Sequence, residues 1–257
     1  MAKIEYVKEI DDLIKIHHVF ATATDKAGLV GNERKDGTII EGLPDNGLLG
    51  LLFEVNPDAI VVSTGGTAKL IAGAGYKVTE VSDYTGWPEM VTGLVKSMNP
   101  KLYVGMLAHR YTESDADYMA KHGVPSMDMV LANFYPFEKT VAENPVGSLK
   151  EIDGEMVAAF EIIRQNMDVG GPTAIHTSRK GFLGTAAATR PEDYVRFAND
   201  LRKYNGCISI DSRTEAMKNC SADLMRYYTA INEFMQGVKV EDVKAAYQKI
   251  NHPAGGE

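Results

Sequence analysis

The sequence predicts a three-layer α/β/α fold, in which a mostly parallel sheet is covered by helices and further helices follow at the C-terminal end. Short apolar runs alternate with helix-forming segments along the chain, and this alternation is typical of parallel sheets. At 257 residues the chain has room for a full hydrophobic core. We expect one domain over 1–257, with a core at 16–180 that holds the ligand site and with final strands and a helical extension at 181–257.

Composition narrows the possible functions. The net charge of −8 argues against nucleic acid or an anionic membrane as the main partner. The chain has no apolar run of membrane-spanning length, and its first residues lack the apolar core of a signal peptide. These observations predict a cytoplasmic protein. Cys207, Cys220, His17 and His18 show no metal-ligand spacing, so we expect packing roles for them and no metal.

Strands are expected where apolar runs are bounded by turn residues. The run at 16–24 ends in Asp-Lys-Ala-Gly, and the run at 127–132 ends in Asn-Phe-Tyr-Pro. By contrast, 31–47 is polar and rich in glycine, and 82–89 is rich in turn formers, so both should be irregular. The expected strands, in order, are 16–24, 59–62, 76–81, 102–107, 127–132, 182–187 and 207–210.

Helices are expected between these strands. Pro172 and Pro191 suit the first turn of a helix, where a missing N–H costs nothing. The segments expected to be helical are 48–54, 68–72, 114–122, 157–166, 172–180, a helix opening at 191, 213–236 and 241–251.

One turn stands out as a candidate anion site. The strand at 59–62 leads into Thr64-Gly65-Gly66-Thr67, and a helix follows directly. Two glycines allow backbone N–H groups to converge, the helix N-terminus contributes its positive dipole end, and threonine hydroxyls can donate to phosphate oxygens. Lys26, after the first strand, is a second candidate anion contact. A plain β-α turn is the alternative interpretation.

Further polar residues follow strand ends or helix-breaking turns. Asn133 and Tyr135 come directly after the strand at 127–132, and the carboxyl edge of a parallel sheet is where such folds bind ligands. Lys96 and Ser97 lie beside a proline turn, and Asp168 opens the turn Asp-Val-Gly-Gly-Pro-Thr.

Together these motifs resemble a known family. The order of 22–26, 63–69, 78–90, 93–96, 133–141 and 168–173 is similar to that in the inosine monophosphate (IMP) cyclohydrolase domain of the bifunctional AICAR transformylase/IMP cyclohydrolase family. The resemblance implies a methylglyoxal synthase-like, Rossmann-like fold and a homodimer. That family carries a large folate-dependent transformylase region for which 257 residues leave no room. We therefore expect a stand-alone cyclohydrolase, with a separate AICAR transformylase as pathway neighbour.

The resemblance also implies a reaction. The family closes the ring of 5-formamidoimidazole-4-carboxamide ribotide to give IMP and water, which requires no metal and no cofactor. Acid–base groups must serve a weak amide nucleophile and a departing hydroxide. The implied catalytic residues are Lys96, Tyr135, Asp168, Lys180 and Asn133, with Asp168 and Lys180 at the carboxamide end, Lys96 and Tyr135 at the formyl oxygen, and Asn133 as an oxyanion donor. The implied residues for the purine ribotide and its phosphate are Thr22, Thr24, Lys26, Thr64, Gly65, Gly66, Thr67, Ser97 and Gly170.

Some positions depart from the family pattern. Leu94 stands where the family has arginine, and Asn99 stands where it has histidine. Lys101 or Arg110 could replace the missing cation. Two other functions stay open: a methylglyoxal synthase, which would leave the motifs at 133–137 and 168–173 without a purpose, and a non-catalytic purine-nucleotide sensor of the same fold.

Overall fold

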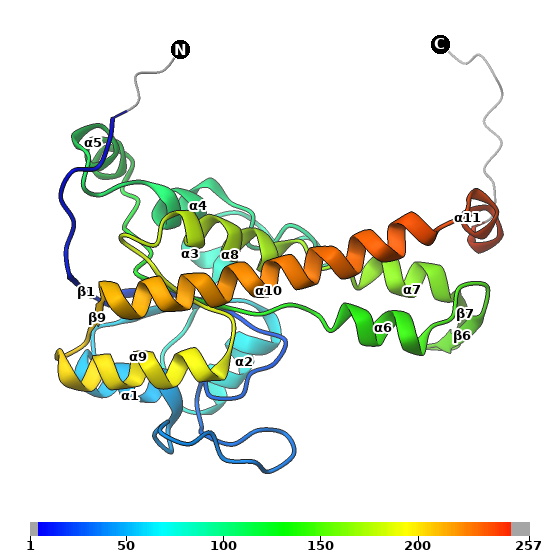
Figure 1. Cartoon of the computed structure of the whole chain (residues 1–257), viewed down its shortest axis with the longest axis horizontal. Helices are drawn as coiled ribbons and strands as arrows, with labels where there is room; N and C mark the ends of the chain where they lie inside the picture. The colour runs from blue at the N-terminus through cyan, green and yellow to red at the C-terminus, as the bar shows by residue number, and fades with distance from the viewer. Residues whose placement is uncertain (1–4, 248–257) are drawn as a thin grey trace. The chain divides into compact units, whose positions relative to one another are not determined.

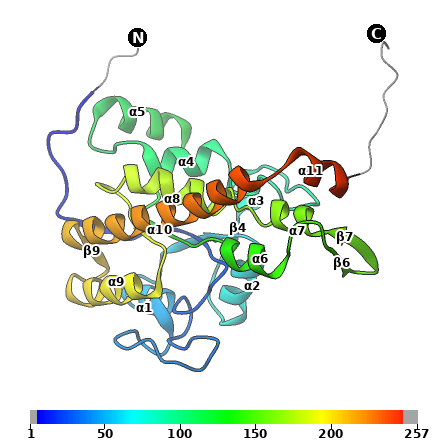
Figure 2. The same ribbon diagram turned by 45° about the vertical axis from the view of Figure 1, so that its right-hand side comes forward.

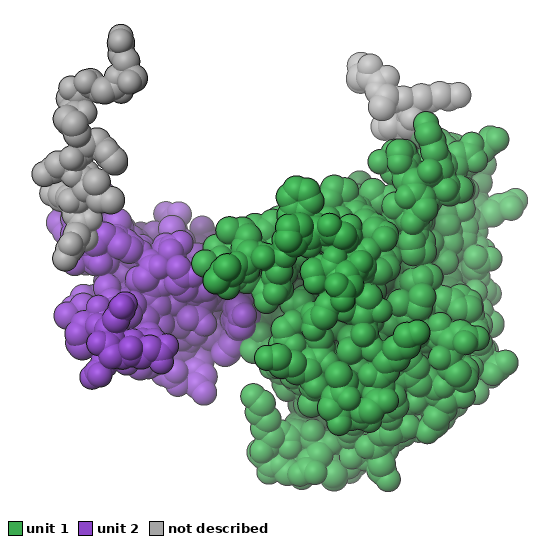
Figure 3. Space-filling view, turned by 180° about the vertical axis from the view of Figure 1, so that it is seen from behind, with its two compact units in different colours: residues 1–134, 169–224 green, residues 135–168, 225–257 purple. Residues whose placement is uncertain are grey.

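The computed structural model describes residues 5–247. The chain divides into two compact units, of which unit 1 is Met1–Phe134 with Val169–Leu224 and unit 2 is Tyr135–Asp168 with Met225–Glu257 (Figure 3). The chain returns from unit 2 at Val169 and then supplies another strand to the sheet of unit 1. The expected single domain, with a core at 16–180 and an extension at 181–257, stays a prediction.

A five-stranded sheet lies at the centre of unit 1, in the order β4-β3-β2-β5-β8. All four neighbouring pairs are parallel. Because β2 lies between β3 and β5, the strand order reverses there, and parallel sheets bind ligands at such a switch point. The strands are β2 (His18–Thr22), β3 (Ile60–Ser63), β4 (Thr79–Glu80), β5 (Met129–Ala132) and β8 (Ala186–Ala188).

Helices cover both faces of this sheet (Figures 1 and 2). On one face Val19 and Ala21 pack with buried residues of α1, α2 and α9, and on the other Phe20 packs with α4, α8 and the first half of α10. Alternate residues of β2 therefore serve two cores, which confirms the expected three layers. The helices are α1 (Gly47–Val55), α2 (Gly65–Gly73), α3 (Val81–Thr85), α4 (Pro100–Leu107), α5 (Glu113–His122), α8 (Gly170–Lys180), α9 (Pro191–Lys203) and α10 (Ile210–Gly237).

A two-stranded ladder closes one end of unit 1. Strand β1 (Leu13–Lys15) pairs antiparallel with β9 (Cys207–Ser209). The fully buried Arg213 of α10 donates hydrogen bonds to the carbonyl groups of Asp11, Asp12, Phe182, Leu183 and Ile208. One guanidinium thus ties the start of the chain to the segment before β8.

Unit 2 consists of α6 (Phe137–Glu143), a hairpin of β6 (Leu149–Ile152) and β7 (Glu155–Ala158), α7 (Ala159–Gln165), α11 (Val240–Ala246) and the end of α10. Aromatic side chains hold it together, since Phe234 stacks on Phe160 and meets Phe137 edge to face. The hairpin turns at Asp153 and Gly154, whose positive φ angles of 52° and 85° suit a type I′ turn.

Most predicted elements are present with shifted ends, and a few predictions are wrong. The segment at 102–107 is the helix α4, not a strand, and 82–85 belongs to the helix α3, not to an irregular loop. The strand predicted at 182–187 is confined to Ala186–Ala188. Strands β1, β6 and β7 were not predicted. The end of the helix predicted at 241–251 lies outside the described residues.

Several broader expectations also have an outcome. The loop expected at 31–47 is irregular up to residue 46 apart from one bridge between Glu33 and Ile39, and Gly47 begins α1. Cys207 and Cys220 are free thiols, and burial raises the pKa of Cys220 to about 12. Within residues 5–247, no helix combines the length and apolar character needed to cross a bilayer.

Candidate active site

The turn after β3 has the geometry of an anion site. Thr64 is extended, with φ −138° and ψ 151°, and Gly65 turns the chain into α2 with a φ of +55°. No side chain caps the N-terminus of α2 in the described chain. The first backbone N–H groups of the helix, together with its positive dipole end, are therefore directed at whatever occupies this turn.

Two lysines approach this turn from different loops. A methyl group placed on Gly66 would lie 3.8 Å from Lys26 Nζ, and one placed on Gly65 would lie 4.0 Å from Lys96 Nζ. Lys26 follows β2, and Lys96 lies in the loop between α3 and α4. The structure therefore brings together two ammonium groups and a helix N-terminus that are far apart in the sequence.

Lys96 is held by its own loop. Its Nζ lies 2.7 Å from Glu89 Oε1. Its stem crosses Gly93, where an added methyl group would lie 2.7 Å from Lys96 Cε, and Gly93 has a φ of +73°. Val95 has a φ of +60°, a conformation that β-branched residues rarely adopt. Glu89 has no role that its sequence context predicts, because a carboxylate in an irregular loop has no periodicity that could place it.

The N-terminus of α8 lies at the same loop. A methyl group on Gly170 would lie 3.1 Å from Ser97 Oγ, and no side chain caps this helix in the described chain. Ser97 is buried. The predicted binding residues Ser97 and Gly170 are therefore neighbours.

The candidate phosphate-binding threonines differ in whether their hydroxyl groups already have a hydrogen-bond partner. Thr67 Oγ1 accepts from Ala23 N at 3.1 Å and donates to Ala23 O at 3.0 Å, so its buried hydroxyl ties the loop after β2 to α2 and is not free for phosphate. This corrects the expected donor role of the Thr67 side chain. The hydroxyls of Thr22, Thr24 and Thr64 have no hydrogen-bond partner within residues 5–247 and lie next to the turn or at the carboxyl end of β2.

Asn133 spans the switch point of the sheet. Its Oδ1 accepts from Thr24 N at 2.7 Å and Asp25 N at 3.0 Å, and its Nδ2 donates to Asp25 O at 2.7 Å. These three bonds fix the loop that carries Lys26. The structure therefore shows Asn133 supporting that loop, whereas the sequence predicted an oxyanion donor.

Lys180 lies at the other end of α8 from Ser97. The helix has eleven residues, from Gly170 to Lys180, which corresponds to about 15 Å along its axis. Lys180 is exposed. Within unit 1, Lys180 therefore lies about a helix length from Ser97, and its expected place beside the substrate stays a prediction.

Tyr135 and Asp168 belong to unit 2. Tyr135 is half exposed, with 45% of its surface accessible. The backbone N–H of Asp168 donates to Tyr227 Oη at 2.6 Å, and burial raises the pKa of Tyr227. Tyr227 thus supports the backbone of Asp168 as a neutral phenol at physiological pH.

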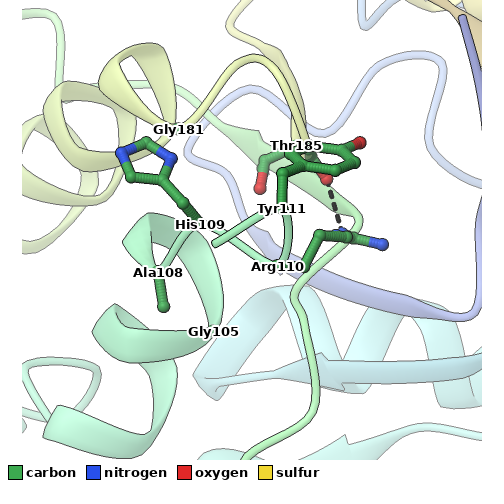
Figure 4. Close-up of a pocket in the computed structure, with 8 residues that line it drawn as sticks. Gly105, Ala108, His109, Arg110, Tyr111, Gly181 and Thr185 are labelled. Atoms are coloured by element: carbon green, nitrogen blue, oxygen red, sulfur yellow. Dashed lines mark hydrogen bonds between the residues drawn. The ribbon is translucent and has the colours of Figure 1, made fainter. Parts of the chain in front are cut away.

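Neither expected replacement for the family's arginine reaches the turn. Lys101 Nζ donates to Tyr84 O at 2.6 Å and lies over the Tyr84 ring. Arg110 pairs with Asp128 at 2.8 Å. It also donates to Gly184 O at 2.6 Å (Figure 4). Both cations are thus bound to other parts of unit 1, and their expected replacement of the missing charge stays a prediction. Leu94, at the family's arginine position, is 55% exposed.

Figure 4 also shows a small cavity beside Arg110. Its volume is about 10 Å³, which is room for one water molecule. The cavity lies at the C-terminal ends of α4 and α8. The N-terminal ends of these helices are the ones beside the Lys96 loop, so the cavity is separate from the turn at Gly65 and Gly66. It is lined by Gly105, Ala108, His109, Arg110, Tyr111, Gly181, Gly184 and Thr185. Among the described residues, no group of three or more His, Cys, Asp or Glu side chains could hold a metal.

Comparison with known proteins finds similar sequences and a similar fold. Residues 55–158 match the model of the MGS-like domain. The chain is also 30% identical over 235 residues to the bifunctional purine biosynthesis protein PurH of Magnetococcus marinus, an alignment that covers 91% of this chain and 38% of that protein. PurH of Bradyrhizobium diazoefficiens is 37% identical over 177 residues, covering 69% of this chain and 31% of that protein.

The chain thus spans about a third of the length of the curated relatives it matches. Among solved structures, ForH aligns with a TM-score of 0.62 at 24% identity, covering 85% of this chain and 98% of that one. This likeness shows a shared fold. The MGS-like fold, predicted from the sequence motifs, is confirmed.

Proposed function

We propose that this protein is an IMP cyclohydrolase, which closes 5-formamidoimidazole-4-carboxamide ribotide to IMP and water in purine biosynthesis. The observation that carries the proposal is the turn at Gly65 and Gly66, flanked by Lys26 and Lys96. A ribotide carries a 5′-phosphate that needs such a site. The homologous PurH proteins, named as bifunctional purine biosynthesis proteins, support the same substrate class.

In the proposed reaction the carboxamide nitrogen attacks the formyl carbon, and the formyl oxygen takes up a proton. The carbinolamine then loses that oxygen as water, and the second nitrogen-bound proton leaves. Lys96 lies beside the phosphate turn, and we assign it to the formyl oxygen and the departing water together with Tyr135. Asp168 and Lys180 keep the carboxamide end, a role that rests on the family resemblance alone. We assign Asn133 to positioning the Lys26 loop, because its amide already makes three hydrogen bonds there.

The direct test is to incubate the purified protein with the formylated ribotide and to follow IMP by absorbance and chromatography. A rate no greater than the spontaneous reaction would refute the proposal. Alanine variants of Lys96, Tyr135, Asp168 and Lys180 then separate chemistry from binding. We expect lower turnover with IMP binding largely retained, whereas a protein that only senses the nucleotide would show no turnover to lose.

Phosphate binding can be tested separately. Lys26→Ala should weaken IMP binding by about tenfold or more, because a charge-assisted contact contributes about 1.5–3 kcal/mol. Lys77→Ala is the matched control, since Lys77 is an exposed lysine beyond the other end of α2. Equal affinities of the two variants in calorimetry would argue against the turn as the phosphate site.

Assembly and location belong to the same proposal. We propose a cytoplasmic homodimer that works beside a separate AICAR transformylase, as the family resemblance implies. Light scattering after size-exclusion chromatography would test the dimer, and a monomer at micromolar concentration would contradict it.

A further inference from the structure

We propose that Glu89 is a positioning residue for Lys96, which keeps the Lys96 ammonium group off the substrate phosphate and available for the reacting end. This inference rests on the proposed function, because it assigns the two lysines at one turn to different parts of the same ribotide.

The two lysines differ in what holds them. Lys26 Nζ donates to a neutral carbonyl, that of Thr24, at 3.3 Å. Lys96 Nζ instead lies 2.7 Å from the Glu89 carboxylate. A phosphate at the turn would meet both ammonium groups. That of Lys26 has no carboxylate within reach in the described chain, whereas that of Lys96 is already paired with Glu89. Lys26 is therefore the natural phosphate contact, and Glu89 competes with phosphate for Lys96.

Glu89 must compete with phosphate for Lys96 because the Lys96 ammonium group lies close to the turn. Lys96 Nζ is only 4.0 Å from the position of a methyl group on Gly65, so a flexible lysine there would fall onto the phosphate. Ion pairs are strongest where solvent is partly excluded. The Lys96 side chain is 27% exposed and that of Glu89 is 44% exposed, so the lysine end of this pair is partly shielded from solvent and the carboxylate end is not.

The backbone of the loop supports the same function. Gly93 allows the lysine stem to cross it, and Val95 is in the left-handed region directly before Lys96. A β-branched residue in that region costs about 1–3 kcal/mol, and such strain gathers where a side chain must be held in one place. The ion pair and the strained backbone therefore fix the same side chain.

The proposal predicts effects of opposite sign on affinity and turnover. In Glu89→Gln the ammonium group is released toward the phosphate and a nearby negative charge is lost. IMP should bind about three- to fivefold more tightly, as expected for removing one charge several ångströms from a dianion in a largely aqueous site. The kcat should fall about ten- to a hundredfold because the lysine is misplaced. A residue that only supported the loop would lower both affinity and kcat.

Glu215→Gln is the matched control. Glu215 pairs with Lys218 at 2.6 Å on α10, and its side chain is 46% exposed, close to the 44% of Glu89. The control removes the same kind of ion pair away from the turn, so kcat, KM and affinity should match the wild type. Glu89→Asp keeps the carboxylate and should recover part of the kcat and the wild-type affinity.

The experiment measures kcat and KM with the formylated ribotide, and the Kd of IMP by calorimetry, for the wild type and the three variants. Tighter IMP binding with lower kcat in Glu89→Gln alone is the expected result. Unchanged kcat, or weaker IMP binding, in Glu89→Gln would overturn the inference while the proposed function stands.

Failure of the proposed function has a different signature, namely a wild-type protein without turnover. The affinities for IMP, and for inorganic phosphate where IMP does not bind, still compare Glu89→Gln with the wild type in that case. Tighter binding supports the placement of Lys96, and equal or absent binding overturns it.

Discussion

Two separable physical reasons favour glycine at position 93. Its φ of +73° disfavours any side chain, and its missing Cβ leaves space for Lys96 Cε. Gly86 has a φ of +72° with open space where a Cβ would be. We expect Gly93→Ala and Gly86→Ala to lose a similar stability, about 1–2 kcal/mol each, and only Gly93→Ala to lose turnover, about tenfold or more.

Urea denaturation and steady-state kinetics on the two variants give the comparison. Equal turnover in Gly93→Ala and Gly86→Ala would show that the stem of Lys96 does not need the space over Gly93.

Thr67 and Thr64 flank the same two glycines but should respond differently to loss of the hydroxyl. Thr67→Val leaves the Ala23 N–H and C=O groups without their partner, which should cost about 1–3 kcal/mol of unfolding free energy. Thr67→Ser should restore it. Thr64→Val should leave stability nearly unchanged, because that hydroxyl has no partner within residues 5–247, and should weaken IMP binding instead. Denaturation and calorimetry on the three variants check this pattern, and a stability loss in Thr64→Val would contradict it.

At this scale the sequence names candidate residues, and the structure adds which of their polar groups are already bound. Thr64 and Thr67 are equivalent in the motif, and only the packing of Ala23 against α2 shows which hydroxyl is used internally. The pairing of Glu89 with Lys96 depends on a loop whose path no periodic pattern specifies.

Among the elements, α4 was predicted incorrectly as a strand. The run Leu-Tyr-Val-Gly-Met-Leu at 102–107 is apolar and suits a buried strand. The deciding residues precede it, since Asn99 Oδ1 accepts from Lys101 N at 2.9 Å and Pro100 begins the helix. Asn99 thus has a structural use where the family has histidine.

The cap of α4 can be tested directly. Asn99→Ala should lower the free energy of unfolding by about 1 kcal/mol, whereas Asn99→Asp should retain stability, because a carboxylate also accepts at a helix N-terminus. Thermal or urea denaturation measures both. Equal loss in the two variants would mean that the cap does not determine the stability of α4.

The hairpin β6–β7 was not predicted because its sequence lacks alternation. All four residues of β6 are exposed, so no buried face leaves a period of two in the sequence. Its Asp153-Gly154 turn was the available signal.

For unit 1 as a whole, the sequence predicted a parallel sheet covered by helices because β2, β3 and β5 are buried apolar runs. It could not predict the strand order, because position in a sheet depends on contacts between distant segments. It also overestimated β8, whose preceding residues are bound through the carbonyls of Phe182 and Leu183 to Arg213 rather than to a strand.

The stability of the protein should depend on pH through Asp193. Asn219 Nδ2 donates to its Oδ1 at 2.7 Å, its Oδ2 is buried without a partner among the described residues, and burial raises its pKa from 3.8. A raised pKa means that the folded state favours the protonated acid. This contribution is fully present below pH 3.8 and is lost as pH rises through the folded pKa.

Asp193→Asn removes that titration. The variant should therefore gain stability relative to the wild type as pH rises from about 4 toward 7. Urea denaturation at several pH values measures the difference, and a difference that stays constant with pH would contradict the assignment.

We expect stability and turnover to oppose each other at Val95. Its left-handed backbone costs folding free energy that a glycine at 95 would recover, about 1–3 kcal/mol. The same replacement would make the backbone before Lys96 more flexible, so the Lys96 side chain would be held less firmly. A laboratory selection for heat resistance alone should therefore accept glycine at position 95, and the selected variants should have a lower kcat. A selection for growth without external purines should keep the valine.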